Sequence, residues 1–454
     1  MTPRRAPPSL PSPLRESRRL SHAFHRSASI LALGTALLAA APSLAAPKAD
    51  PAATVGKIVA SKPFKAAVAR LDADFDRTVA DIVTLTEIPA PPFKEEARAK
   101  AYLAMLKAHG LTDVTMDAEG NVMGIRPGTA TKGKGPFVVM AAHLDTVFPE
   151  GTDVKVRREG TKLMAPGIGD DTRSLATLLA YMRALDAAGI KTRSDILFVG
   201  NVGEEGPGDL RGVRYLFNKS AYKGRITAFF SMDGSDPTRI VDGGTGSKRY
   251  HVAYTGPGGH SYGAFGTVNP MTAMAKTVVD LYAVQTPKDP KTTYSASVTG
   301  GGTSVNSIPH DVFMQFDMRS ESAAELAKLD QTLLGIIDAA VAGENAARDT
   351  RFGKITAEPK VIGERPAGAT PRTADIVVLT SAAITALGFK PEHDISSTDS
   401  NIPMSLGIPA VTIGSGGKAG RAHALDEWID VEKGESLRGM QVGLAALLAV
   451  AGVD

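Results

Sequence analysis

Residues 137–147 have the sequence FVVMAAHLDTV, in which six apolar residues are followed by a histidine and, two residues later, an aspartate. A continuous apolar run of this length is typical of a strand buried on both faces of a sheet. Residues two apart in extended backbone point to the same side, so His143 and Asp145 should project together from the end of this strand. The stretch predicts a polar site at the edge of a buried sheet.

The chain continues as an alternation of helices and buried strands. Helical spacing marks residues 52–111 and 174–187, and the second segment ends at Gly189. Further apolar runs of strand type occupy 196–199 and 228–232. Alternation of this kind predicts an α/β sheet.

A different pattern begins near Gly246. Two half-exposed strands and two helical segments follow, at 250–254, 312–317, 270–284 and 323–341. The first pattern then returns, with an apolar strand and a final helix, at 410–413 and 436–450. We therefore expect a discontinuous catalytic domain over 46–246 and 362–454, interrupted by an α+β lid domain over 247–361.

The first 45 residues differ in composition from the rest of the chain. They hold six arginines and one acidic residue, so the basic excess in the formal net charge of +3 lies here. The apolar stretch 28–41 and the small residues Ser43 and Ala45 predict an export signal over 1–45 and a periplasmic or secreted protein. The stretch is too short to span a membrane, although an uncleaved anchor stays open, as does the choice between Sec and twin-arginine export. The near-neutral remainder gives no electrostatic reason to expect a nucleic acid.

Candidate chemistry lies in polar clusters that mostly follow the predicted strands, where open α/β sheets bind ligands. The chain has no cysteine, so a thiol nucleophile and a thiolate metal site are both excluded. Two histidines and three carboxylates stand in these clusters: His143, Asp170, Glu205, Asp233 and His423. This donor set predicts two zinc sites that share one carboxylate, with Glu204 left over to handle protons.

Each cluster taken alone also has a plain structural explanation. His143 could be a buried histidine satisfied by Asp145, and Asp171 could cap the helix that follows it. The Glu204–Glu205 pair could be solvated surface. Only the joint order of the clusters is specific for a metal site.

Four motifs resemble one known family: His143-Leu144-Asp145-Thr146-Val147, Gly169-Asp170-Asp171, Glu204-Glu205 and Gly256-Pro257-Gly258-Gly259-His260-Ser261. It is the zinc metallopeptidase family of peptidase T (tripeptidase), glutamate carboxypeptidase, aminoacylase and succinyl-diaminopimelate desuccinylase, and the resemblance extends from about residue 75 to 454. It implies a phosphorylase/hydrolase-like zinc peptidase catalytic domain of α/β class with an inserted α+β ferredoxin-like lid domain that mediates dimerisation. It also implies two Zn2+ per chain, with Mn2+ or Co2+ as possible substitutes.

The resemblance assigns roles to the metal ligands. His143 and Asp233 would bind one zinc, Glu205 and His423 the other, and Asp170 would bridge both. It also implies a cis peptide bond between Asp170 and the next residue. Thr172 departs from the family, because many members have a lysine at this position.

Other residues match catalytic and substrate-binding positions of the family. Glu204 matches the general base, and Asp145 would orient the metal-binding imidazole of His143. His260, in the lid, matches a histidine that reaches the active site of the partner subunit and stabilises the oxyanion. Three residues resemble positions that contact substrate: Asn306, Arg319 and Arg365.

We therefore expect an exported dinuclear zinc metallopeptidase that hydrolyses amide bonds of small peptides, as a di-/tripeptidase or an aminopeptidase-like enzyme. A carboxypeptidase or an N-acyl-amino-acid deacylase of the same family stays open, as does a one-metal amidohydrolase. A non-catalytic zinc- or peptide-binding protein is the alternative from another class, and the spare carboxylate of Glu204 argues against it. The expected partners are a small peptide or N-acyl amino acid as substrate and a second copy of the chain in a homodimer.

Overall fold

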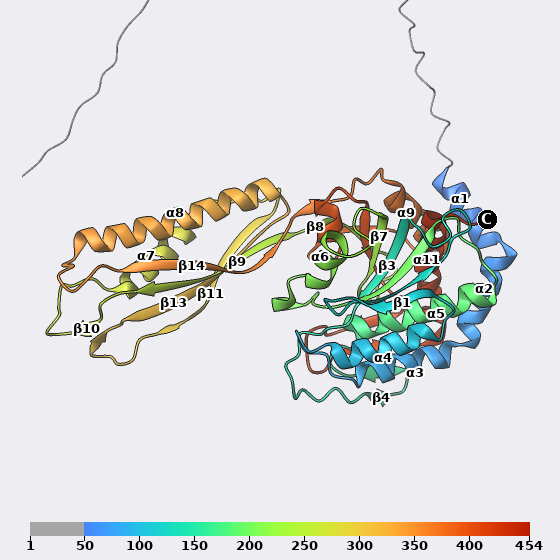
Figure 1. The fold of residues 1–454 in the computed structure, drawn as a ribbon, viewed down its shortest axis with the longest axis horizontal. Helices are drawn as coiled ribbons and strands as arrows, with labels where there is room; N and C mark the ends of the chain where they lie inside the picture. The colour runs from blue at the N-terminus through green and yellow to red at the C-terminus, as the bar shows by residue number, and fades with distance from the viewer. Residues whose placement is uncertain (1–49) are drawn as a thin grey trace, which may run out of the picture. The chain divides into compact units, whose positions relative to one another are not determined.

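The computed structural model describes residues 50–454, so the export signal predicted over 1–45 lies outside the described residues. The main sheet has nine strands in the order β1-β2-β6-β3-β7-β17-β8-β15, with β16 also paired to β8 (Figure 1). Their bounds are β1 Thr112–Met116, β2 Val122–Arg126, β3 Phe137–His143, β6 Asp195–Asn201, β7 Ile226–Met232, β8 Arg239–Gly244, β15 Gly368–Ala369, β16 Glu392–Ser396 and β17 Ala410–Ile413. The four central strands β6, β3, β7 and β17 run parallel, so their carboxyl ends lie at one edge of the sheet.

Helices cover both faces of this sheet, and the alternation of side chains along β3 shows why. Val138 and Met140 belong to a core shared with helices α5 (Arg173–Ala187) and α11 (Lys433–Ala451). Val139 and Ala141 point the other way, into a core that includes helix α6 (Arg211–Asn218). The continuous apolar run therefore fills two cores at once, as predicted for a strand buried on both faces. The remaining helices of this part are α1 Pro51–Ala60, α2 Lys62–Ala73, α3 Phe75–Thr86, α4 Glu96–Lys107, α9 Asp375–Ala386 and α10 Asn401–Ser405.

A second sheet with its own core occupies the region of changed pattern. Its elements follow in the order β9 Gly246–Thr255, α7 Pro270–Tyr282, β11 Thr292–Gly301, β13 Asp311–Ser320, α8 Ala323–Ala347 and β14 Thr356–Arg365. The strand order β11-β13-β9-β14 with this β-α-β-β-α-β succession is ferredoxin-like, as predicted. Helices α7 and α8 pack on it (Figure 1), and its apolar residues form a separate cluster. The exact domain boundaries at 246/247 and 361/362 stay a prediction.

Two small sheets complete the described chain. Strands β10 (Gly259–His260) and β12 (Ser307–Ile308) pair beyond the end of the inserted sheet at which Thr255 lies opposite Asp311. Strands β18 (Lys418–Gly420), β19 (Trp428–Asp430), β5 (Lys162–Met164) and β4 (Arg157–Glu159) form the other sheet. This last sheet brings the segment before Asp170 next to the segment that carries His423. Among residues 50–454, no helix is long and apolar enough to cross a membrane.

Candidate metal centre and active site

His143 is the last residue of β3 and is 1% exposed. Its Nδ1 lies 3.1 Å from the main-chain oxygen of Asp145, and its Nε2 lies 2.9 Å from Oδ1 of Asp170. An imidazole whose Nδ1–H donates to a carbonyl presents the lone pair of Nε2, as metal ligation requires. The histidine therefore faces the cluster with the nitrogen that could bind a cation.

The carboxylate of Asp145 has a different contact from the one expected. It stays 3.7 Å from Nδ1 of His143 and instead accepts the main-chain N–H groups of Glu204, at 3.0 Å, and Glu205, at 2.8 Å. The orienting contact to His143 comes from the main chain of Asp145, while its carboxylate fixes the loop of the two glutamates. Asp145 thus links the ends of β3 and β6.

Asp170 lies between the two predicted histidine ligands. Its Oδ1 contacts His143, and its Oδ2 is 3.1 Å from Nε2 of His423. The peptide bond between Asp170 and Asp171 is cis, as expected. The loop begins at Gly167, whose φ is +76°. A Cβ at this position would lie 2.5 Å from Cγ2 of Thr146, so only glycine fits.

The two other predicted carboxylates complete the cluster. Glu205 Oε1 is 2.9 Å from Nε2 of His423, and Asp233 follows β7 directly. Two groups bring one ligand atom from each member within 4.8 Å of the others: His143, Asp170 and Glu205, and His143, Asp171 and Asp233. The two groups share His143, and the contact of Glu205 with His423 adds the fifth predicted ligand, so all five lie at the carboxyl edge of the sheet. The side chain of His423 is 55% exposed, so the cluster opens to solvent on its side.

Asp171 and Asp399 belong to this region although the sequence did not single them out as ligands. Asp171 is buried, and its Oδ2 accepts the main-chain N–H of His143 at 3.1 Å; the alternative role as a helix cap is not observed, because helix α5 has no side-chain capping hydrogen bond at its described N-terminus. Asp399 is buried and accepts from Asn201 Nδ2 at 2.6 Å. One carboxylate oxygen of each, Oδ1, has no hydrogen-bond partner among residues 50–454. Asn201 is the last residue of β6 and lies opposite His143, the last residue of β3. This pairing places Asn201, and with it the bound carboxylate of Asp399, beside the cluster.

The electrostatics of the cluster reflect crowded carboxylates beside imidazoles. Burial, reinforced by the charge of Asp170, raises the pKa of Asp233 to about 6. Hydrogen bonds to Asp170 and Glu205 raise the pKa of His423 to about 10. Burial lowers the pKa of His143, but its interactions with Asp145 and Asp170 outweigh this and raise it well above 6.5. A cation would neutralise such a group of carboxylates, and imidazole and carboxylate donors suit Zn2+, Mn2+ or Co2+.

Glu204 and Arg365 form a buried pair beside the cluster. Arg365 is the last residue of β14 and is 5% exposed. Its Nη1 lies 3.1 Å from Glu204 Oε1 and 3.1 Å from Ser397 Oγ, and its Nη2 donates to the main-chain oxygen of Glu204. Burial raises the pKa of Glu204 well above its usual value, the arginine opposes this rise and Glu205 adds to it. The inserted sheet therefore delivers a guanidinium to the expected general base.

Residues 139–449 match the model of peptidase family M20/M25/M40. The chain belongs to this family. This confirms the family that the four sequence motifs indicated, which is a family of hydrolases.

Relatives of this M20 chain agree with the assignment. A Pyrococcus furiosus protein with the provisional name LysW-lysine/LysW-ornithine hydrolase is 34% identical over 122 residues, which cover 27% of this chain and 32% of that protein. The chain thus matches about a third of the length of this curated relative.

Solved structures share the fold over nearly their whole lengths. Aminopeptidase PepT from Bacillus cereus has a TM-score of 0.67 at 21% identity, covering 83% of this chain and 99% of that one. A tripeptidase from Staphylococcus aureus has a TM-score of 0.67 at 18% identity, covering 83% and 98%. The YxeP protein of Bacillus subtilis, described as a dinuclear metal binding peptidase from the M20 family, has a TM-score of 0.60 at 17% identity, covering 83% and 98%. These likenesses establish the M20 fold with its inserted α+β part.

Three further predicted residues of this M20 chain lie between β9 and β14, and their described side-chain hydrogen bonds and ion pairs stay within that part of the chain. His260 is exposed on β10, and its Nδ1 accepts the main-chain N–H groups of Tyr262 and Gly263 at 3.3 and 3.2 Å. Asn306 is exposed and accepts from Ser304 Oγ at 2.6 Å. Arg319 pairs with Asp317 at 2.7 Å and is 44% exposed. Among the described contacts, none joins these three residues to the cluster.

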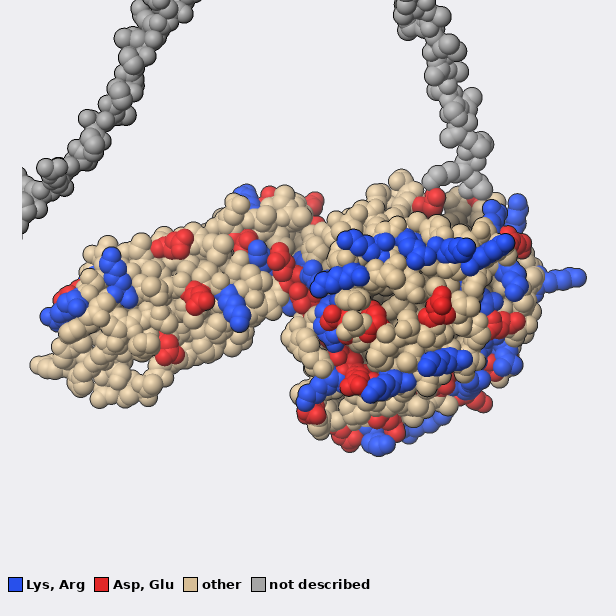
Figure 2. Space-filling model, in the orientation of Figure 1, with Lys and Arg blue, Asp and Glu red and all other residues tan. Residues whose placement is uncertain are grey.

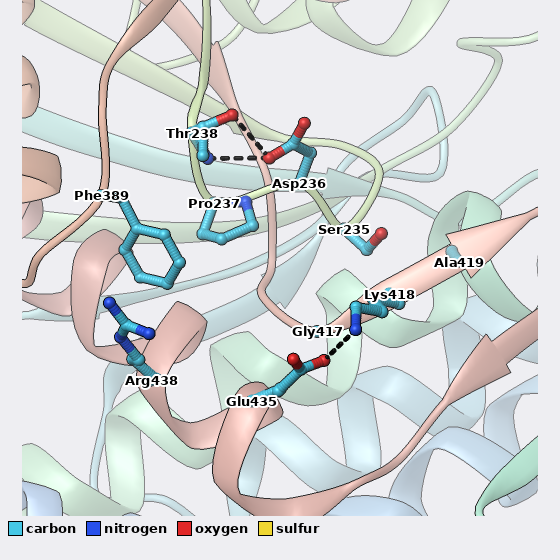
Figure 3. Close-up of a pocket in the computed structure, with 10 residues that line it drawn as sticks. All are labelled: Ser235, Asp236, Pro237, Thr238, Phe389, Gly417, Lys418, Ala419, Glu435 and Arg438. Atoms are coloured by element: carbon cyan, nitrogen blue, oxygen red, sulfur yellow. Dashed lines mark hydrogen bonds and ion pairs between the residues drawn. The ribbon is translucent and has the colours of Figure 1, made fainter.

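A surface pocket of about 380 Å³ is separate from the predicted site residues (Figure 3). Its charged side chains already have partners within it. Lys418 pairs with Glu435 at 2.7 Å, the guanidinium of Arg438 lies 4.2 Å from the ring centre of Phe389, and Asp236 accepts from Thr238. We therefore assign the functional site to the buried cluster and not to this pocket.

Proposed function

We propose that the chain is an exported, dinuclear-metal peptidase that cleaves amide bonds in small peptides. The observation that carries the proposal is the position of Asp170, which contacts both predicted histidine ligands, His143 and His423. A carboxylate held between two imidazoles, with further carboxylates on either side, is the donor arrangement that two shared cations need. The peptidase neighbours support the reaction class.

The proposed metal ligands divide into two sets. His143 and Asp233 would hold one ion, Glu205 and His423 the other, and Asp170 would serve both. Zinc is the proposed ion, with manganese or cobalt as substitutes. When bound, the ion pair supplies Lewis acidity that polarises an amide carbonyl and makes a water molecule more acidic.

Glu204 is the proposed general base. Its main-chain N–H is held by Asp145, and its carboxylate is buried beside Arg365. A carboxyl with a raised pKa holds a proton more readily at neutral pH, which suits a group that takes a proton from the attacking water and returns it to the leaving amine. Glu204 thus has a use in hydrolysis that a protein which only binds zinc or peptides would not need.

Arg365 supports a substrate with a free carboxylate near the scissile bond. Its guanidinium is buried, and its Nε has no hydrogen-bond partner among the described residues. Arginine binds carboxylates through two parallel hydrogen bonds, which would satisfy such a group. A di- or tripeptide meets this requirement, and so does an N-acyl amino acid, which keeps a deacylase as the second candidate.

The test is metal analysis combined with turnover of the purified protein, on a panel of di- and tripeptides, their C-terminal amides and N-acyl amino acids. We expect about two metal ions per chain, cleavage that a chelator abolishes, and a preference for free carboxylates over the amides. Absence of both metal and cleavage after reconstitution with zinc would refute the proposal. Export is tested separately, because N-terminal sequencing of native protein that finds residue 1 or 2 intact contradicts signal cleavage.

A further inference from the structure

The carboxylate of Glu427 is buried and accepts three main-chain N–H groups from one loop. Glu427 is 1% exposed. Its Oε2 accepts from Gly167 at 2.8 Å, and its Oε1 accepts from Gly169 at 2.7 Å and from Asp170 at 2.9 Å. Three main-chain donors therefore converge on the two oxygens of one carboxylate. One side chain therefore fixes the backbone of the loop that ends in the shared carboxylate.

Glu427 also belongs to the segment that carries the exposed histidine of the cluster. It lies four residues after His423, between β18 and β19. Its main-chain oxygen accepts from Ala165, and its main-chain nitrogen donates to Ala424. Two segments more than 250 residues apart are thus tied together at one residue, and each contributes a side chain to the pair between Asp170 and His423.

The loop is fitted closely around this carboxylate. A Cβ built on Gly169 would lie 3.1 Å from Glu427 Oε1, so a larger residue there would press on the acceptor. The main-chain N–H of Asp170 is one of the three donors, and its side chain points to the two imidazoles. The direction of the Asp170 carboxylate therefore depends on a backbone that Glu427 holds.

We propose that Glu427 is a positioning residue that places Asp170 and His423 for metal binding; this inference rests on the proposed dinuclear function. Glu427 does not reach the ligand atoms itself. It acts through the backbone of the Asp170 loop, in the way that outer partners of metal ligands orient them.

A matched control exists at the other end of the main sheet. Asp195, the first residue of β6, is 0% exposed and accepts three main-chain N–H groups of another glycine-rich loop. The donors are Gly128 at 2.7 Å, Gly133 at 2.8 Å and Gly135 at 2.6 Å. The two carboxylates share burial and hydrogen bonding, but only Glu427 touches a loop with a predicted ligand.

The experiment compares Glu427→Gln with Asp195→Asn by zinc titration against a competing chelator. An amide can accept through only one of its two terminal atoms, so each substitution turns an N–H toward main-chain donors. We expect Glu427→Gln to weaken the weaker of the two zinc sites by roughly 10–100-fold, the usual effect of losing a partner of a metal ligand. Asp195→Asn should lower the melting temperature of the metal-free protein and leave zinc affinity unchanged. Equal zinc affinities in Glu427→Gln and wild type would overturn the inference.

Two further measurements keep the result decisive. The visible spectrum of the cobalt-loaded protein should change in Glu427→Gln and not in Asp195→Asn, because it reports ligand geometry. Hydrogen exchange of metal-free wild type should show protected amides at 167–170, and fast exchange there would overturn the inference without any variant. If wild type binds no metal, the proposed function itself fails; if it binds two ions that Glu427→Gln binds equally well, only the role of Glu427 fails.

Discussion

His143 at the end of β3 and His260 on β10 differ in burial and in the residues that they contact. His143 is buried among carboxylates that it contacts within the same chain. His260 is exposed, and the described hydrogen bonds of its side chain go to its own loop. The surface around β10 carries few charged side chains in Figure 2, and its exposed residues include Tyr262 and Phe265. The residues proposed to bind metal thus come together within one chain, whereas we propose that His260 acts on the site of a second copy of the chain.

The largest expected effect on turnover concerns the buried cluster around His143. Glu204→Gln keeps an acceptor for Arg365 but cannot take a proton, so kcat should fall by about 10²- to 10⁴-fold. The metal content should stay at the wild-type level, because Glu204 lies outside both groups of close ligand atoms. Steady-state kinetics with metal analysis of the same sample provide the measurement.

The matched control for this variant is Glu344→Gln in helix α8, which packs on the inserted sheet. Glu344 is also buried and accepts the main-chain N–H of Asn269 at 3.0 Å. It should lower thermal stability without changing kcat. Near-wild-type turnover by Glu204→Gln would remove the general base from the proposal.

A smaller effect on turnover tests the proposed role of the exposed His260. His260→Ala should lower kcat by roughly 10²- to 10³-fold, the loss typical for one oxyanion donor, with zinc binding unchanged. Because Nδ1 accepts two N–H groups, the proton of the neutral imidazole sits on Nε2, which can then donate.

Mixing two inactive variants tells whether His260 acts on a partner. A dimer of Glu204→Gln and His260→Ala chains contains one site with both an intact Glu204 and a His260 from the other chain. We expect the mixture, after exchange of subunits, to be more active than either variant alone. If activity does not recover in mixtures shown to contain mixed dimers, His260 does not act across the interface.

The smallest effect concerns acid stability. Burial lowers the pKa of His109 to about 4, with the charge of Arg183 in support. The unfolded chain, with a histidine pKa near 6.5, then takes up a proton that the folded chain resists. The contribution of neutral His109 to the free energy of unfolding is fully present above pH 6.5 and is lost as the pH falls toward 4. Melting temperatures over this range should fall less in His109→Gln than in wild type, and an equal fall in His109→Gln would contradict the assignment.

Much of the fold was predictable because the sequence patterns match local geometry. The apolar runs at 137–142 and 228–232 became central strands, and the polar residues after them met at one edge, since parallel strands end together. The change of pattern at Gly246 likewise marked the start of the second sheet.

The remaining features depend on contacts that no local pattern encodes. Asp171 resembles a helix cap in sequence, and only the folded loop turns its carboxylate to the N–H of His143. Glu427 depends on a sheet of three-residue strands, which are too short to show a period. The contact of Asp145 with the glutamate loop joins segments about 60 residues apart, so spacing alone pointed to its neighbour His143 instead.

The inserted sheet enters and leaves the main sheet at a single point. Ser247 pairs with Arg365 across the first and last inserted strands, while Gly244 pairs with Gly368 in the main sheet just beneath them. The pairing of β8 with β15 therefore joins the two chain crossings within the main sheet, so this sheet does not depend on the inserted strands for its own hydrogen bonds. Exchange of the segment between Gly246 and Arg365 would thus replace Arg365 beside Glu204 and leave the strands that position the five predicted ligands in place.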